Sequence, residues 1–163
     1  MTELPVPSRA FLEEIGVRPS KGRGQNFLKE AWVVDRMAAE LGIGPGDLVV
    51  EVGPGLGALT GALLATGATV HAIELDDQLA AYLRTTLASE QFVLTSTDAR
   101  TAPIDEIVPE GRDYALAANL PYSSAPAILR HFLEAERPPA RSICMVQREV
   151  ALRMSAEPPD MSI

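Results

Sequence analysis

The chain has 163 residues, 47% of them hydrophobic, with one cysteine, two histidines and a formal net charge of −8 at pH 7. This length and apolar content suit one domain with a buried core, and a single cysteine excludes a disulfide within the chain. The two histidines lie far apart and lack other ligands at metal-binding spacing, so we predict no metal site. No stretch resembles a signal peptide or a membrane span, and we expect a cytoplasmic protein with no membrane partner.

Helical and strand-like segments alternate from residue 30 onward, after a short helical pattern near residues 11–15. Apolar runs predict strands over 48–52, Ala68–Leu75, Gln91–Thr95, Tyr114–Ala118 and Ser142–Gln147. Apolar residues at helical spacing predict helices over about 30–41, 58–66, 77–88, 125–135 and 148–154. This alternation predicts an α/β fold with a largely parallel sheet covered on both faces. We expect the strands, numbered along the chain, to pair in the order 3-2-1-4-5.

The turn after the first strand is rich in glycine. The stretch Leu48–Thr60, LVVEVGPGLGALT, places Gly53, Gly55 and Gly57 between an apolar strand and a helix. Glycine lets such a turn reverse tightly and lets a ligand approach bare backbone, as in Rossmann-like folds. A glycine-rich turn alone could still be only a tight connection, so its role as a ligand site depends on the residues that end the other strands.

Polar residues stand at the ends of the next three predicted strands. Glu74 can accept hydrogen bonds from both hydroxyls of a ribose, and Asp98 can accept one from the amino group of a base. Asn119 ends the fourth strand. Because ligands bind beyond the carboxyl ends of parallel strands, the set predicts a site for a nucleoside-bearing ligand.

The charge near this turn favours a cation. No lysine follows the glycines as in nucleotide-binding P-loops, and Glu51, Glu74 and Asp76 would repel a pyrophosphate. S-adenosylmethionine carries a sulfonium, an ammonium and a ribose, and therefore suits the predicted pocket better than NAD.

The tetrapeptide Asn119-Leu120-Pro121-Tyr122 indicates the acceptor. The Asn119 side-chain oxygen and the Leu120 carbonyl could accept hydrogen bonds from an adenine amino group and draw its nitrogen toward tetrahedral geometry. Pro121 would fix the turn, and Tyr122 offers a face on which an extruded base can stack. We therefore predict these four residues as the catalytic motif. A plain proline turn with a surface tyrosine is the structural alternative.

Positive charge gathers near both ends of the chain. The segment 18–29 holds no acid and four basic residues, Arg18, Lys21, Arg23 and Lys29, and from its charge alone it could be solvated surface. The sequence stops at Met161–Ile163, which resembles the start of another strand, so we expect a truncated chain whose last strands are missing. The fifth strand would then be an exposed apolar edge through which the chain could self-associate. We divide the chain into a basic segment, 1–29, and an incomplete Rossmann-like domain, 30–163.

Several motifs together resemble the ribosomal RNA adenine dimethyltransferases of the KsgA type. These are GQNFL at 24–28, VVEVGPGLGALT at 49–60, IELD at 73–76, DA at 98–99, NLPY at 119–122 and MVQREVALRM at 145–154. The resemblance implies a class I S-adenosylmethionine-dependent methyltransferase that dimethylates N6 of two adjacent adenines near the 3′ end of small-subunit rRNA, on an immature small ribosomal subunit. The cofactor positions it implies are Asn26, Leu28, Gly53, Glu74, Asp98 and Asn119. It also implies that the basic segment 18–29 lies over the cofactor and contacts RNA through its four basic residues.

The sequence departs from this family in two respects. Ser123-Ser124 stands where the family commonly has Asn-Ile, and we expect this change to be tolerated. Family members also continue beyond this length, with further strands, a second aromatic residue for the target base and a small helical domain. We therefore expect the 163-residue chain to methylate more slowly than a completed one.

Two other functions remain open. The first is the related large-subunit rRNA adenine N6-methylase that confers macrolide resistance, which shares NLPY-like motifs. The second is a non-catalytic RNA-binding or ribosome-assembly factor on the same fold. Intact Glu74, Asp98 and Asn119–Tyr122 favour an enzyme over that second alternative. A DNA adenine methylase is less favoured, since Asn-Pro-Pro-Tyr is commoner there.

Overall fold

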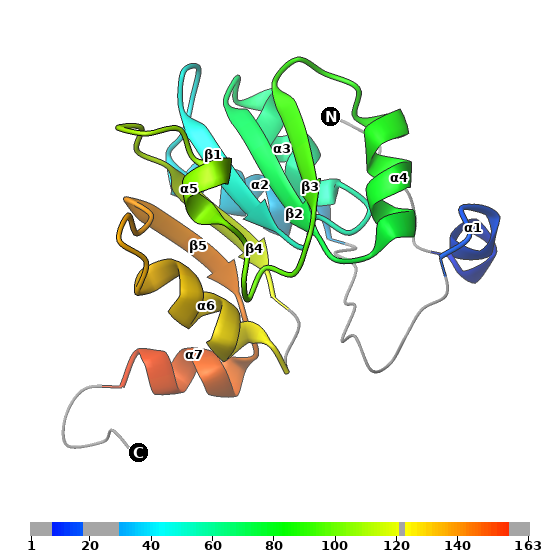
Figure 1. Ribbon diagram of the computed structural model, residues 1–163. Coiled ribbons are helices and arrows are strands. Elements are labelled where there is room, and N and C mark those ends of the chain that lie inside the picture. The colour runs from blue at the N-terminus through cyan, green and yellow to red at the C-terminus, as the bar shows by residue number, and fades with distance from the viewer. Residues whose placement is uncertain (1–7, 18–29, 121–122, 157–163) are drawn as a thin grey trace.

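A five-stranded parallel sheet forms the centre of the computed structural model, which describes residues 8–17, 30–120 and 123–156 (Figure 1). Its strand order is β3-β2-β1-β4-β5, and each neighbouring pair is parallel. The strands are β1 (Leu48–Val52), β2 (Thr69–Glu74), β3 (Phe92–Ser96), β4 (Ala115–Asn119) and β5 (Arg141–Met145). The predicted fold class, strands and pairing order are confirmed.

Helices alternate with these strands, as the periodicity predicted. They are α1 (Arg9–Glu14), α2 (Ala31–Leu41), α3 (Ala58–Ala65), α4 (Asp77–Thr86), α5 (Ile104–Ile107), α6 (Ala125–Leu133) and α7 (Arg148–Met154). Most boundaries fall within two residues of their predicted positions. The sequence did not predict α5, because four residues form a single turn and cannot show helical periodicity.

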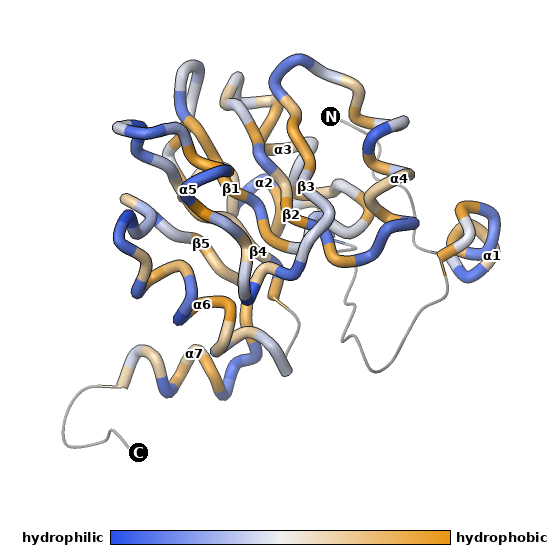
Figure 2. Tube along the Cα trace, in the orientation of Figure 1, coloured by the Kyte–Doolittle hydropathy of each residue, from blue (hydrophilic) through white to orange (hydrophobic). Residues whose placement is uncertain are grey.

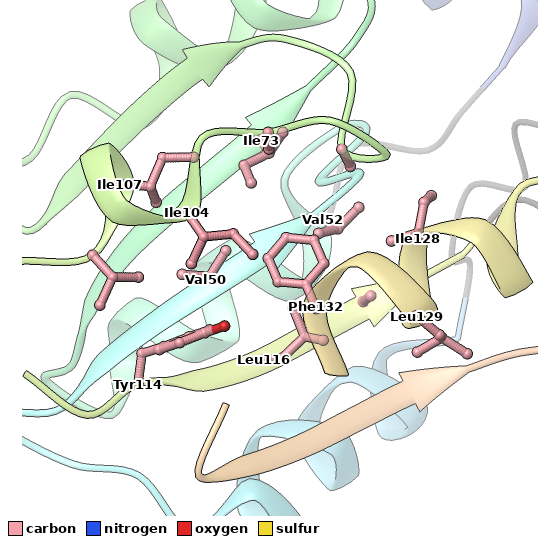
Figure 3. Packing of buried hydrophobic residues seen from close by; sticks show 14 of the residues in the cluster. Val50, Val52, Ile73, Ile104, Ile107, Tyr114, Leu116, Ile128, Leu129 and Phe132 are labelled. Carbon is pink, nitrogen blue, oxygen red and sulfur yellow. The ribbon is translucent and has the colours of Figure 1, made fainter. Parts of the chain in front are cut away.

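Two hydrophobic cores lie on the opposite faces of the sheet, because alternate side chains of a strand point to opposite sides. On one face, Phe132 of α6 is fully buried among residues of β1, β4 and α5 (Figure 3). On the other face, Leu63 of α3 packs with residues of α2, β1 and β4. All five residues of β1 are buried, and the hydropathy colouring shows apolar strands at the centre of the molecule (Figure 2). The central strand is therefore fixed from both sides.

A smaller apolar cluster joins α1 to α4. Leu12 and Val17 pack with Leu56 and Leu79, and the rings of Phe11 and Tyr82 meet edge to face at 5.8 Å. This part of residues 1–29 is therefore packed on the Rossmann-like domain. Residues 18–29, on which the predicted basic segment depends, lie outside the described residues.

The parallel arrangement places all strand carboxyl ends at one edge of the sheet. The glycine turn after β1, the end of β2, the loop after β3 and the end of β4 meet there. At the opposite edge, Arg141 donates hydrogen bonds from Nη1 to the carbonyls of Leu41 and Gly42, at 3.1 and 2.7 Å, and so ties the start of β5 to the end of α2.

Candidate functional site

The glycine turn exposes backbone at the carboxyl edge of β1. Gly53, Gly55 and Gly57 have φ angles of 69°, 59° and 82°, which residues with a Cβ rarely adopt. A Cβ on Gly57 would lie 2.9 Å from side-chain carbons of Leu83 and Leu87, so this glycine is also needed for packing. These angles suit a tight turn and leave its backbone open to the close approach of a ligand.

Glu74 connects this turn to the beginning of α4. Its carboxylate is only 7% exposed and accepts a hydrogen bond from Gly55 N at 3.2 Å and another from Asp76 N at 2.9 Å. Burial raises the pKa of Glu74, against the opposing effect of these backbone donors. Each carboxylate oxygen has a second lone pair with which it can accept a ribose hydroxyl. The structure therefore places Glu74 against the turn, as the sequence predicted.

Glu51 is a second buried carboxyl in the same region; the sequence indicated its negative charge near the turn but not its burial. It is 1% exposed, and its Oε2 atom has no hydrogen-bond partner among the described residues. The Oγ1 atom of Thr60, at the start of α3, is also buried and has no hydrogen-bond partner among the described residues. Burial, with a further contribution from the charge of Glu74, raises the pKa of Glu51 to about 8, against a smaller opposing effect of the nearby Thr60. The signal in the sequence was one acidic residue inside an otherwise apolar strand.

Asp98 lies in the loop that follows β3. Its carboxylate accepts hydrogen bonds from the backbone N of Arg100 at 2.9 Å and from Nε of the same residue at 3.0 Å. Hydrogen bonds from Arg100 hold the pKa of Asp98 below its usual value. An adenine amino group would have to share this carboxylate with Arg100 or displace it. The predicted role of Asp98 in base recognition stays a prediction.

Asn119 is the last residue of β4 and is half-buried. A Cβ on Gly53 would lie 3.8 Å from the Asn119 carbonyl oxygen, so the end of β4 directly adjoins the glycine turn. Leu120 is buried and donates its backbone N–H to the Met145 carbonyl at 3.1 Å. The structure therefore brings Gly53, Glu74 and Asn119 to one edge.

Other predicted site residues lie outside the described residues. These are Asn26, Leu28, Pro121 and Tyr122, together with the basic residues Arg18, Lys21, Arg23 and Lys29. Within the described ranges, no three His, Cys, Asp or Glu side chains gather as a metal site would require. No helix in the same ranges is long and apolar enough to cross a membrane.

The residues at this edge fit a cationic nucleoside cofactor. Two buried carboxyls, one with an unpartnered oxygen, adjoin a turn of bare backbone. The same fold is seen in a geranyl diphosphate methyltransferase in complex with S-adenosylmethionine, with a TM-score of 0.57, 17% identity and coverage of 72% of this chain and 49% of that one. The chain therefore has the Rossmann-like fold of the class I S-adenosylmethionine-dependent methyltransferases.

Comparison with known proteins identifies the family. The sequence model of the ribosomal RNA adenine dimethylase family matches residues 19–162. The chain belongs to this family, which confirms the resemblance inferred from its motifs. It is 43% identical over 160 residues to ribosomal RNA small subunit methyltransferase A of Streptomyces avermitilis and 44% identical over 169 residues to that of Moorella thermoacetica.

These alignments cover 94% and 97% of this chain but 53% and 59% of the two relatives, so the chain spans little more than half of their length. Among solved structures, the 23S rRNA methyltransferase ErmE matches with a TM-score of 0.68 and 29% identity, over 78% of this chain and 50% of that one. A dimethyladenosine transferase from Plasmodium falciparum shares the fold, with a TM-score of 0.68, 24% identity and coverage of 81% and 47%.

Proposed function

We propose that the chain carries the catalytic site of an S-adenosylmethionine-dependent rRNA adenine dimethyltransferase. Its substrate would be N6 of two adjacent adenines near the 3′ end of small-subunit rRNA, on an immature small ribosomal subunit. The supporting observation is the meeting of the glycine turn, the Glu74 carboxylate and Asn119 at one sheet edge. The relatives named above are small-subunit rRNA methyltransferases, and they support this choice of substrate.

The cofactor side of the proposed site is built from the turn and the two buried carboxyls. Glu74 would hold the ribose while keeping Gly55 in place, and the negative charge near the turn would favour the sulfonium. Asp98 would bind the adenine amino group, and Asn26 and Leu28 would complete the cofactor site. Bound there, S-adenosylmethionine would supply the methyl group.

The acceptor side of the proposed site is built from the end of β4. The Asn119 side-chain oxygen and the Leu120 carbonyl would accept the two hydrogens of the target amino group, which concentrates its lone pair for attack. Pro121 would fix this turn, and Tyr122 would stack on the extruded base. The dimethylated or monomethylated nitrogen would lose its extra proton to water, so no basic side chain is needed.

The RNA would reach this edge of the sheet from outside. We propose that Arg18, Lys21, Arg23 and Lys29 bind its phosphates, and that the protein acts in the cytoplasm, where small subunits mature.

A second candidate is adenine methylation of large-subunit rRNA, which the similarity to ErmE favours. A non-catalytic assembly factor is the remaining alternative.

The test is methyl transfer by the purified chain to unmethylated small subunits and, separately, to large-subunit rRNA, with the product nucleoside identified by mass spectrometry. We expect N6,N6-dimethyladenosine in the small-subunit reaction, even at a low rate. Transfer only to the large subunit would support the second candidate. Intact cofactor binding with no transfer to either RNA would contradict both enzymatic proposals.

Two variants test the assignment of roles, with Glu90→Gln on an exposed loop as a matched control. Glu74→Gln should weaken cofactor binding by roughly 1–3 kcal/mol, the typical cost of a charge-assisted hydrogen bond. Asn119→Ala should lower kcat and leave cofactor affinity close to that of the unaltered chain. Unchanged affinity in Glu74→Gln would remove Glu74 from the site, and equal losses of affinity and turnover in Asn119→Ala would make Asn119 a cofactor residue only.

A further inference from the structure

One oxygen of the buried Glu51 carboxyl has no hydrogen-bond partner that would explain its position among the described residues. It lies in the central strand, 1% exposed, and its Oε2 atom is unpartnered within the part of the chain that the structure describes. Leaving a buried polar atom unpaired costs free energy, so such a group in a native protein calls for an explanation, such as a ligand, an ion or a bound water. The proposed function uses Glu51 only for its contribution to the charge near the turn.

Among the residues that the structure describes, none offers Glu51 a compensating cation. The sequences of α3, ALTGALLA, and β4, ALAAN, contain no titratable side chain. On α2, apolar residues face the core, while Asp35, Arg36 and Glu40 are exposed. From β2, Glu74 acts on Glu51 as a like charge, and Asp76 at the start of α4 acts in the same way on Glu74.

A carboxyl in this position is stable as the neutral acid, because burial and a neighbouring carboxylate both disfavour its ionised form. A ligand that brings a positive charge to the adjacent turn reverses this balance, since an ion pair with the carboxylate becomes possible. Within the described residues, the unpartnered oxygen of Glu51 and the unpartnered hydroxyl of Thr60 are available to such a ligand or to the proton.

We infer that Glu51 is a proton-exchanging counter-ion, which is a neutral acid in the free protein and loses its proton to solvent when a cofactor bearing an ammonium group binds beside the glycine turn. This inference rests on the proposed function, because it takes the turn as the cofactor site. The proton passes from the Glu51 carboxyl to the buffer, the ligand keeps its own ammonium proton, and no other bond changes. Cofactor affinity is thereby linked to pH.

The size of the effect follows from the pKa of about 8 that burial gives Glu51. At pH 7, about nine-tenths of the free molecules would hold the proton, and binding would release close to one proton per ligand. As the pH is raised toward 7, the affinity for the cofactor should increase about tenfold for each pH unit, because each bound ligand must displace one proton.

Titration calorimetry of the whole chain in phosphate and in imidazole buffer, at pH 6 and pH 7, measures the number of protons released. The probes are S-adenosylhomocysteine, which carries the ammonium group, and 5′-methylthioadenosine, which lacks the amino-acid part. We expect about one proton released with the first and none with the second. Glu51→Gln should bind S-adenosylhomocysteine without proton release, and its affinity should not rise between pH 6 and pH 7. The exposed-loop variant Glu90→Gln should behave as the unaltered chain does.

Infrared spectroscopy of the free chain provides a second measurement that does not depend on binding. The carbonyl stretch of a buried carboxylic acid should be present at pH 7, disappear with S-adenosylhomocysteine and be missing in Glu51→Gln. Absence of this band in the free chain, or the same proton release from Glu51→Gln, would overturn the inference. Binding of S-adenosylhomocysteine without proton release would overturn it while leaving the proposed function intact. Failure to bind either S-adenosylhomocysteine or S-adenosylmethionine would overturn both.

Discussion

Arg137 connects two segments that are distant in sequence. Its replacement by alanine tests how much its hydrogen bonds to the region of α5 contribute to the stability of the fold. The side chain donates hydrogen bonds to the carbonyls of Val108 and Pro109 at 2.9 Å each, and to Oδ1 of Asp105 at 2.9 and 3.2 Å. These groups belong to α5 and to the residues that follow it, whereas Arg137 lies between α6 and β5. One guanidinium therefore fixes the connection into β4 against the connection into β5.

The two kinds of contact should contribute unequally to stability. The Arg137 side chain is 30% exposed, whereas that of Asp105 is 76% exposed, so their ion pair should contribute about 0.5 kcal/mol. A charged donor to a carbonyl contributes roughly 1–2 kcal/mol, and Arg137 serves two carbonyls. We expect Arg137→Ala to lower the free energy of unfolding by about 3 kcal/mol and Asp105→Ala by less than about 1 kcal/mol.

Urea unfolding followed by circular dichroism measures both values, and calorimetry should show a loss of about 10 °C in Tm for Arg137→Ala. Arg112→Ala is a matched control, because Arg112 is exposed and donates to a single carbonyl, that of Gly46, at 3.0 Å. Similar losses for Asp105→Ala and Arg137→Ala would refute the reasoning, since they would assign the stability to the ion pair.

The sheet and its cores support three further predictions. Because folding raises the pKa of Glu51 from 4.5 to about 8, its neutral form stabilises the fold fully below pH 4.5, and this contribution is lost as the pH rises toward 8. Urea unfolding at several pH values should show that the free energy of unfolding falls by about 1.4 kcal/mol per pH unit between pH 5 and 8 in the unaltered chain but not in Glu51→Gln. The same dependence on pH in both proteins would contradict this. Phe132→Ala should lower the free energy of unfolding by about 3–5 kcal/mol in the same assay, because Phe132 is fully buried. The self-association proposed for the outer strand β5 predicts that light scattering will give a mass that rises with concentration, whereas the constant mass of a single chain would exclude it.

The sequence predicted most of the fold because its strands and helices have distinct periodicities. Five apolar runs separated by helical segments leave few topologies for a parallel sheet, and the pairing order followed from them. The prediction of β5 was shifted toward the C-terminus. Its apolar residues suggested Ser142–Gln147, but pairing with β4 begins at Arg141, and Gln147 is already the N-cap of α7.

The site was less completely predictable, because it depends on which side chains are buried and which are already paired. The positions of Glu74 and the glycine turn at the strand ends followed from their spacing, whereas their role in cofactor binding stays a prediction. The isolation of Glu51 could not be derived without knowing that Ala72 and Ala117 flank it on the neighbouring strands. The pairing of Asp98 with Arg100 depends on the conformation of a loop, which no periodicity describes.

The central position of β1 has a consequence for the order in which the protein folds during synthesis. β1 pairs on one side with β2, which follows it closely, and on the other with β4, where Val49 lies opposite Ala115. The first pairing closes a short loop, whereas the second must wait until many more residues have been made. A nascent chain can therefore place Glu74 against Gly55 well before Asn119 arrives. The turn and the carboxylate proposed to hold the ribose can thus come together before the residues proposed to hold the target base are joined to them.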